Sequence, residues 1–269
     1  MLMLRTVMNE LLIIVLAGFA TGITTVLFGF GGGFVVVPFV YQLLAQQPLL
    51  AADAMHIAVA TSTAVMIFNA GWASYHNWRG CKLNKATLLP LLWFIALGAV
   101  IGSSLAGEMD DNWIRRLFII YMLVTIADCL LRKGFFSCST PRSLSRLTAS
   151  AGGTAMGIIA AMLGVGGSVM TVPLLRRHGY AMRDCVSAAN PLSLPVAICG
   201  AITYAISGWQ KIAASGYLGF ISLKILVLLV IAGFSGIMFA RRCIPAVPDG
   251  WHARVYVALL CLVLFAIAV

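Results

Sequence analysis

Two glycine-rich stretches have the composition of an anion-binding site. Residues 28–40 read FGFGGGFVVVPFV, and residues 163–175 read LGVGGSVMTVPLL. Glycines ahead of a helix let a ligand approach the backbone closely, and the first N–H groups of that helix are unpaired at the positive end of its dipole. We therefore expect an anion to bind where the helices resume, at Phe34 and Ser168. The glycines of the predicted site are Gly29, Gly31, Gly32, Gly33, Gly164, Gly166 and Gly167.

The two stretches are in the same register. Gly29 corresponds to Gly164 and Pro38 to Pro173, at a constant offset of 135 residues. Such a repeat indicates internal duplication, and glycine breaks at corresponding places of two halves point to the substrate site of a transporter. Close packing of membrane helices on small residues is the alternative explanation. Neither copy ends in Lys-Ser or Lys-Thr, which excludes a nucleotide-binding P-loop.

Polar residues follow each glycine stretch within apolar sequence. A second similarity, between residues 71–75 and 200–204, has an offset of 129 and places Thr61 opposite Asn190. These side chains could hydrogen-bond an oxyanion, although ordinary bonds between helices are equally compatible with the pattern. Lys224 lies inside another apolar stretch, where a cation either attracts an anion or extends to the membrane surface. The polar candidates after the glycine stretches are Thr61, Ser62, Thr63, Asn69 and Asn190.

Other ionisable residues have more ordinary predicted roles. Asp53 and Asp184 each precede an apolar segment, as helix N-caps do. His56 follows Asp53 closely and is a candidate proton relay. The scattered Cys and His residues show no metal-ligand spacing, so we expect no metal or other cofactor.

The composition is that of an all-α polytopic membrane protein. Of 269 residues, 61% are hydrophobic and only 10% are charged, and the mean hydropathy is +1.00. The net charge of +10 comes from short basic clusters between apolar stretches. That pattern indicates membrane topology and contact with lipid headgroups, not nucleic-acid binding.

The predicted organisation is two membrane repeats, 1–131 and 147–269, joined by a cytoplasmic linker, 132–146. Each repeat is expected to contain a glycine-broken re-entrant helix pair and three crossings, so that the odd number inverts the second repeat. The positive-inside rule places the linker in the cytoplasm, and the acidic turn 108–111 and both termini outside. The predicted crossings are 54–75, 86–107, 117–131, 185–207 with breaks at its prolines, 217–240 and 253–269.

The motifs GFGGGFVVVP and GVGGSVMTVP resemble those of the TauE/SafE family of sulfite and organosulfonate exporters, and the resemblance covers nearly the whole chain. It implies an inner-membrane permease for small sulfur-containing anions, and it points to the glycines of both motifs. Family members often carry Thr-Ser after each motif. Thr61-Ser62 match this pattern, whereas the second half has Asn190-Pro191.

We therefore predict a secondary transporter, an exporter of sulfite or an organosulfonate, that works by alternating access. Two helix starts would hold the anion, and Thr61, Ser62 and Asn190 would orient it. No ATP-binding motif is present, so a gradient must supply the work unless a partner does; H⁺ and Na⁺ are the candidate coupling ions, and the sequence does not choose between them. An anion channel, and a permease for another small carboxylate or oxyanion, remain open. A membrane subunit that anchors a partner would leave the glycine breaks without a role, and an enzyme is disfavoured by the lack of paired carboxylates, HExxH or GxSxG.

Overall fold

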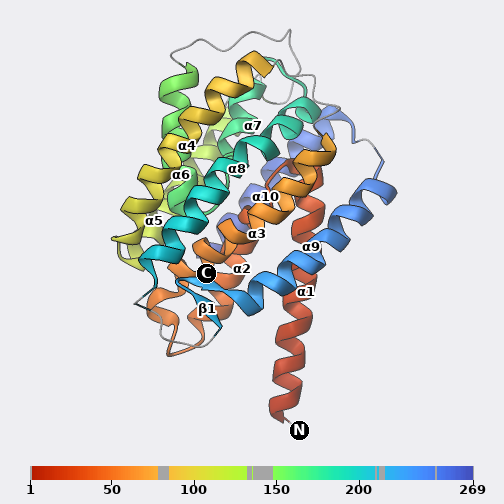
Figure 1. Ribbon diagram of the computed structural model, residues 1–269. Coiled ribbons are helices and arrows are strands. Elements are labelled where there is room, and N and C mark those ends of the chain that lie inside the picture. The colour runs from red at the N-terminus through yellow and green to blue at the C-terminus, as the bar shows by residue number, and fades with distance from the viewer. Residues whose placement is uncertain are drawn as a thin grey trace.

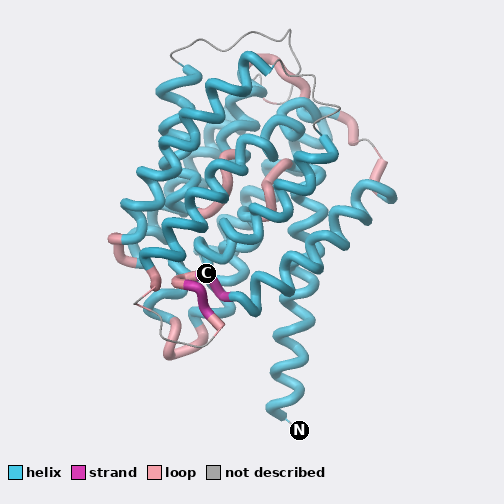
Figure 2. Tube along the Cα trace, viewed as in Figure 1, coloured by secondary structure: helices cyan, strands magenta, loops and turns pink. Residues whose placement is uncertain are grey.

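The computed structural model describes residues 2–77, 85–131, 135, 148–209, 211, 216–245 and 247–268, and most of them are helical (Figures 1 and 2). The all-α polytopic prediction is confirmed. The first half contains α1 (Leu2–Phe28), α2 (Gly33–Ala45), a 3₁₀ turn (Ala51–Asp53), α3 (Ala54–Asn77), α4 (Lys85–Gly107) and α5 (Asp111–Leu131). The second half contains a π-helical turn (Thr148–Gly152), α6 (Gly153–Leu163), α7 (Ser168–Arg177), α8 (Met182–Ser207), the strands β1 (Tyr217–Leu218) and β2 (Ile221–Ser222), α9 (Leu223–Cys243) and α10 (Asp249–Ala268). The predicted linker lies outside the described residues except for Phe135.

Six helices in the described part of the chain are long and apolar enough to cross a membrane: α1, α3, α4, α8, α9 and α10. The helix α1 is longer than the sequence predicted, and its apolar span, Glu10–Phe28, has the length of a full crossing. The predicted crossing 117–131 belongs to α5, which is not among the six. This helix carries Arg115, Arg116 and Asp128, and these charges lower its hydropathy.

Two further predictions about helix limits were wrong. The predicted crossing 217–240 begins later, because its first residues form a hairpin in which Tyr217 pairs with Ser222 and Leu218 with Ile221. The helix α8 runs without a break through Pro191 and Pro195. Membrane helices tolerate proline because neighbouring groups satisfy the backbone positions that it frees.

Glycines bring helices of the two halves into close contact. A Cβ atom on Gly22 of α1 would lie 2.1 Å from the carbonyl oxygen of Gly233 in α9, and one on Gly157 of α6 would lie 2.2 Å from that of Ile95 in α4. Gly22 and Gly157 are 135 residues apart, as are Gly98 of α4 and Gly233. The first helix of each half thus packs on a helix of the other half, at glycines that follow the repeat.

The two glycine-broken helix pairs enter the molecule from opposite ends. Asp111, the first residue of α5, accepts hydrogen bonds from the backbone N–H groups of Met55 and His56, where α3 follows α2. Asp128, near the other end of α5, forms an ion pair with Arg177 at the end of α7. The helices α2 and α7 therefore end on opposite sides of the molecule, as inverted repeats require. The boundaries of the repeats, and which side faces the cytoplasm, stay predictions.

The starts of α3 and α8 are capped by distant carboxylates. Asp111 accepts the N–H of His56 in the first turn of α3. Asp249, the first residue of α10, accepts the N–H of Met182 at the start of α8. Asp184 lies in the first turn of α8, whose N-cap position, Ala181, carries no capping side chain. The prediction that Asp184 is the cap was therefore wrong, and at α3 the carboxylate that holds the helix start is that of Asp111, not Asp53.

Candidate ligand site at the glycine turns

Both glycine turns interrupt the helical body far from its two ends, where Figure 2 shows short loop segments inside the bundle. Five of the predicted glycines have positive φ angles, which side-chain-bearing residues rarely adopt. Gly33 and Gly167 do not, and Gly167 has an ordinary φ of −67°. The positive values are 71° at Gly29, 62° at Gly31, 97° at Gly32, 64° at Gly164 and 71° at Gly166.

The two turns meet, and Ser62 of α3 lies between them. A Cβ on Gly33 would be 2.5 Å from the carbonyl oxygen of Gly164, so only glycine fits there. The Ser62 hydroxyl lies 3.0 Å from the carbonyl oxygen of Gly33 and 2.7 Å from that of Gly164, and it donates its hydrogen to this pair. The structure thus brings together the residues that the sequence placed in two separate motifs.

Met66 fills the space next to Ser62. Its Cγ would be 2.8 Å from a Cβ on Gly31, and its Sδ 2.6 Å from a Cβ on Gly166. The side chain is fully buried. Sequence reasoning did not select Met66, although its position one helical turn after Ser62 places it on the same face of α3.

The helices that leave the turns begin without side-chain caps. The N-cap residue of α2 is Gly32 and that of α7 is Gly167, and neither helix start receives a capping side chain. Their first N–H groups have no partner within the helix and carry the positive end of the dipole. Ser168 is fully buried, and its hydroxyl has no hydrogen-bond partner among the described residues.

Beside the first turn lie two more buried polar side chains without partners in the described structure. The amide nitrogen of Asn69 would be 3.0 Å from a Cβ on Gly32, and the Cγ2 of Thr21 would be 2.9 Å from it. Neither amide atom of Asn69 makes a hydrogen bond, and neither does the hydroxyl of Thr21. Leaving such groups unpaired costs about 1–3 kcal/mol each. Thr21 carries no signal in the sequence that separates it from other threonines of α1.

Phe34, the second residue of α2, adds an apolar wall. Its ring stacks on that of Phe30 with 4.4 Å between the centroids, and both side chains are fully buried. A ligand that lies at this helix start would therefore meet N–H donors together with an aromatic surface.

The remaining predicted residues are divided between this region and others. Asn190 of α8 donates from its amide nitrogen to the carbonyl oxygen of Thr25 at 3.2 Å, and its amide oxygen is buried without a partner in the described structure. Thr61 instead accepts the N–H of Ser222 in the β1–β2 hairpin, at 3.1 Å. Lys224 is exposed in the first turn of α9, so the prediction that it lies deep in a crossing was wrong. The apolar hairpin before α9 had extended the apparent crossing.

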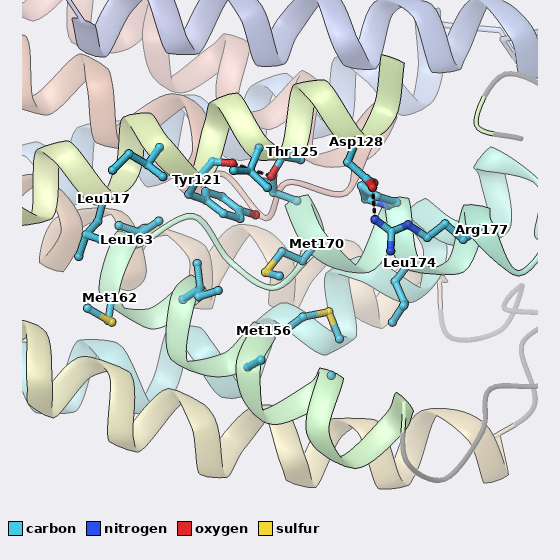
Figure 3. A pocket seen from close by; sticks show the side chains of 17 residues that line it. Leu117, Tyr121, Thr125, Asp128, Met156, Met162, Leu163, Met170, Leu174 and Arg177 are labelled. Atoms are coloured by element: carbon cyan, nitrogen blue, oxygen red, sulfur yellow. Dashed lines mark hydrogen bonds and ion pairs between the residues drawn. The ribbon is translucent and has the colours of Figure 1, made fainter. Parts of the chain in front are cut away.

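Two cavities approach this region from different sides. The first, of about 520 Å³, lies between α5, α6 and α7 and reaches Leu163 and Val169 on either side of the second turn. Figure 3 shows its apolar lining, with Met156 and Met170 inside and the Asp128–Arg177 pair at one end. The second, of about 790 Å³, is lined by α3, α4 and α8 and reaches Pro191, next to Asn190. Ser62, Met66 and Asn69 line neither cavity and are fully buried, so the centre is closed.

Helix ends that meet inside a multi-pass helical bundle are typical of membrane transporters. The chain belongs to the sulfite exporter TauE/SafE family, whose profile matches residues 14–267. It is 29% identical over 217 residues to a "Probable membrane transporter protein" of Haemophilus influenzae, and the aligned region covers 79% of each chain. It is 22% identical over 223 residues to a probable membrane transporter protein of Methanocaldococcus jannaschii, and the aligned region covers 81% of this chain and 80% of the relative. No solved structure matches the chain.

Proposed function

We propose that this membrane transporter is a secondary exporter of a small sulfur-containing anion, such as sulfite or an organosulfonate, across the inner membrane. The observation that carries the proposal is the meeting of the two glycine turns at Ser62 and Met66. Each turn leads into a helix start without a side-chain cap, and buried polar groups without partners among the described residues lie beside them. The family name concerns sulfite export and supports the same class of substrate.

The donors at the centre suit a compact oxyanion. Each helix start presents several N–H groups together with about half a positive charge, and Asn69, Thr21 and Ser168 add side-chain donors. A sulfite or sulfonate group carries three oxygens that can accept from several directions at once. The rings of Phe30 and Phe34 would face an apolar substituent of an organosulfonate.

The closed centre favours alternating access over a channel. Ser62 bonds both turns, and Met66 occupies the space between them, so no open path runs through this point. We propose that Ser62 and Asn190 contact the anion once these contacts separate, and that Thr61 acts from beside the hairpin. An H⁺ or Na⁺ gradient would supply the work. Both termini and the acidic turn 108–111 would lie outside the cytoplasm.

The test is a thermal-unfolding screen of the purified full-length protein with sulfite, thiosulfate, sulfate, taurine and sulfoacetate, and with acetate as the carboxylate control. A ligand at 100 times its Kd stabilises the folded state by about 2.7 kcal/mol, which is about 5–10 °C in melting temperature. We expect a sulfur oxyanion to give this shift. Stabilisation by acetate alone would overturn the sulfur-anion proposal, and equilibrating instead of concentrative uptake in sealed vesicles would show a channel.

A further inference from the structure

His56 joins three helices at the end of the molecule where the β1–β2 hairpin lies. It belongs to the first turn of α3, and its side chain is only 5% exposed. The ring nitrogen Nδ1 contacts the Asp111 carboxylate of α5, and Nε2 lies 3.0 Å from the carbonyl oxygen of Ala106 in α4. One imidazole thus holds α3, α4 and α5 together.

The partners of this ring require two protons on it. A carbonyl oxygen only accepts, so Nε2 must carry a hydrogen. The Asp111 carboxylate already accepts the backbone N–H groups of Met55 and His56, one on each of its oxygens. A carboxylate also only accepts, so Nδ1 must carry the second hydrogen. The arrangement therefore binds one proton more than neutral histidine does.

The geometry points to the His56–Asp111 pair as a proton-binding site that closes this end of the transporter. When the pair releases a proton to water, the proton comes from Nε2, because Nδ1–H donates to a carboxylate and Nε2–H only to a neutral carbonyl. Imidazolium becomes imidazole, and the pair changes from neutral to a net charge of −1. The lone pair of Nε2 then faces the carbonyl oxygen of Ala106, and two acceptors repel each other. The bond between α3 and α4 is lost, while α3 stays bonded to Asp111 of α5.

The hairpin is tied to the same ring. Phe220, in the turn of the hairpin, is fully buried, and its ring stacks on that of His56 with 5.0 Å between the centroids. The next residues reach toward the centre, where the N–H of Ser222 bonds the Thr61 hydroxyl. Release of the proton would therefore loosen the hairpin that covers Thr61, only one residue before Ser62 of the proposed site.

Few other charges act on His56. Lys211 lies on the Phe220 ring, 5.8 Å from its centroid, and donates to the carbonyl oxygen of Gly107, so it opposes a charged His56 only across that ring. Arg115 of α5 is directed away, toward the carbonyl oxygens of Ile267 and Ala268 at the end of α10. Asp53, Glu108 and Asp110 lie near His56 or its partners in the sequence, and the buried Tyr204 of α8 bonds the end of α6. Further ionisable groups on α3, α5 and the hairpin are Tyr75, His76, Arg116, Tyr121, Asp128, Cys129 and Tyr217.

The opposite end of the molecule has an equivalent tie that cannot titrate. Asp249 accepts the N–H of Met182 at the start of α8, as Asp111 does at α3, but its side-chain partner is Arg176. Arg176 is 1% exposed and also donates to the carbonyl oxygens of Phe135 and Tyr180. Arginine keeps its proton at every physiological pH. The histidine near this pair is His252, one turn further along α10, and its Nε2 contacts the carbonyl oxygen of Leu27 at the end of α1.

Hydrogen–deuterium exchange of the full-length protein in detergent, without any anion, tests the site. After correction for the intrinsic exchange rate, the peptide over 216–222 should lose about tenfold in protection between pH 6 and pH 8.5, a range in which histidine side chains change charge. The peptide over 54–57 should change little, because the N–H groups of Met55 and His56 stay bonded to Asp111. In His56→Gln this dependence on pH should disappear. His178→Gln is the matched control, because that ring has a single carbonyl partner, Leu174, at the other end. It should behave as the wild type does.

Asp111→Asn tests the other member of the pair, and it should expose the hairpin already at pH 6. Wild-type protection that changes less than twofold over the pH range would overturn the proposal, as would a full response in His56→Gln. If His56→Gln does not fold, the wild-type profile and Asp111→Asn decide. The measurement needs no substrate, so its failure is independent of the sulfur-anion screen.

Discussion

Adjacent glycines in the second turn provide a matched test of the backbone argument. Gly166 has a φ of 71°, whereas Gly167 has a φ of −67°. An alanine in the left-handed region costs about 1–2 kcal/mol. At Gly166 its Cβ would also lie 2.6 Å from the Met66 sulfur, but a flexible methionine can move. At Gly167 the nearest atom, the carbonyl oxygen of Leu192, is 3.3 Å away.

The expected result is a different melting temperature for two nearly identical variants. At about 2–4 °C per kcal/mol, Gly166→Ala should lower it by about 2–8 °C. Gly167→Ala should leave it unchanged or raise it slightly, because alanine restricts the unfolded chain. Thermal unfolding followed by tryptophan fluorescence, in one detergent and at one pH, measures both. Equal losses, or a larger loss for Gly167→Ala, would refute the assignment of strain to Gly166.

Three further substitutions separate the proposed site from its surroundings. Ser62→Ala should destabilise the protein by about 1–3 kcal/mol, since two buried carbonyl oxygens lose their donor; an unchanged denaturant midpoint would contradict this. Asn69→Leu should raise the melting temperature, because an unpartnered buried amide is removed, and abolish stabilisation by the sulfur anion; retained stabilisation would exclude Asn69 from the site. Lys224→Gln should change anion affinity less than twofold in a binding titration at fixed ionic strength, because Lys224 is exposed; a tenfold loss would restore it to the site.

A fifth prediction concerns topology and uses labelling in cells. A cysteine that replaces Pro141 in the linker should react only after the membrane is permeabilised, and one that replaces Asp110 should react in intact cells. The reverse result would invert the assignment of inside and outside, although the arrangement of the helices would stand.

Local patterns explain what the sequence predicted correctly. A glycine with positive φ is needed wherever the turn occurs, and the register of two copies marked five such positions. Hydropathy predicted most of the long helices because it is also a local property. Each residue contributes to the mean hydropathy of its segment whichever residues lie beside it in the fold. It failed for the hairpin before Lys224, where apolar residues form strands and not the start of a helix.

Pairings between distant segments could not be read from the sequence. Asp111 caps a helix that starts 57 residues earlier, and Asp249 one that starts 67 residues earlier. Asn69 was a candidate from its type, but only packing against Gly32 and Thr21 shows that its amide has no partner. The sequence does not distinguish Met66 from other core residues, because its contact with both turns depends on the fold.

Because helices of one half pack on helices of the other, the time between the synthesis of two partners differs from pair to pair. The helix α6 follows its partner α4 closely along the chain, whereas α9, which covers the Gly22 face of α1, begins at Leu223. That is roughly 200 residues after α1 ends, or about 10–40 s at 5–20 residues per second. Throughout that interval the glycine face of α1 must rest against lipid or the insertion machinery. A ribosome that stalls before α9 would therefore leave an inserted first half without its lateral partner, a ready substrate for membrane proteases.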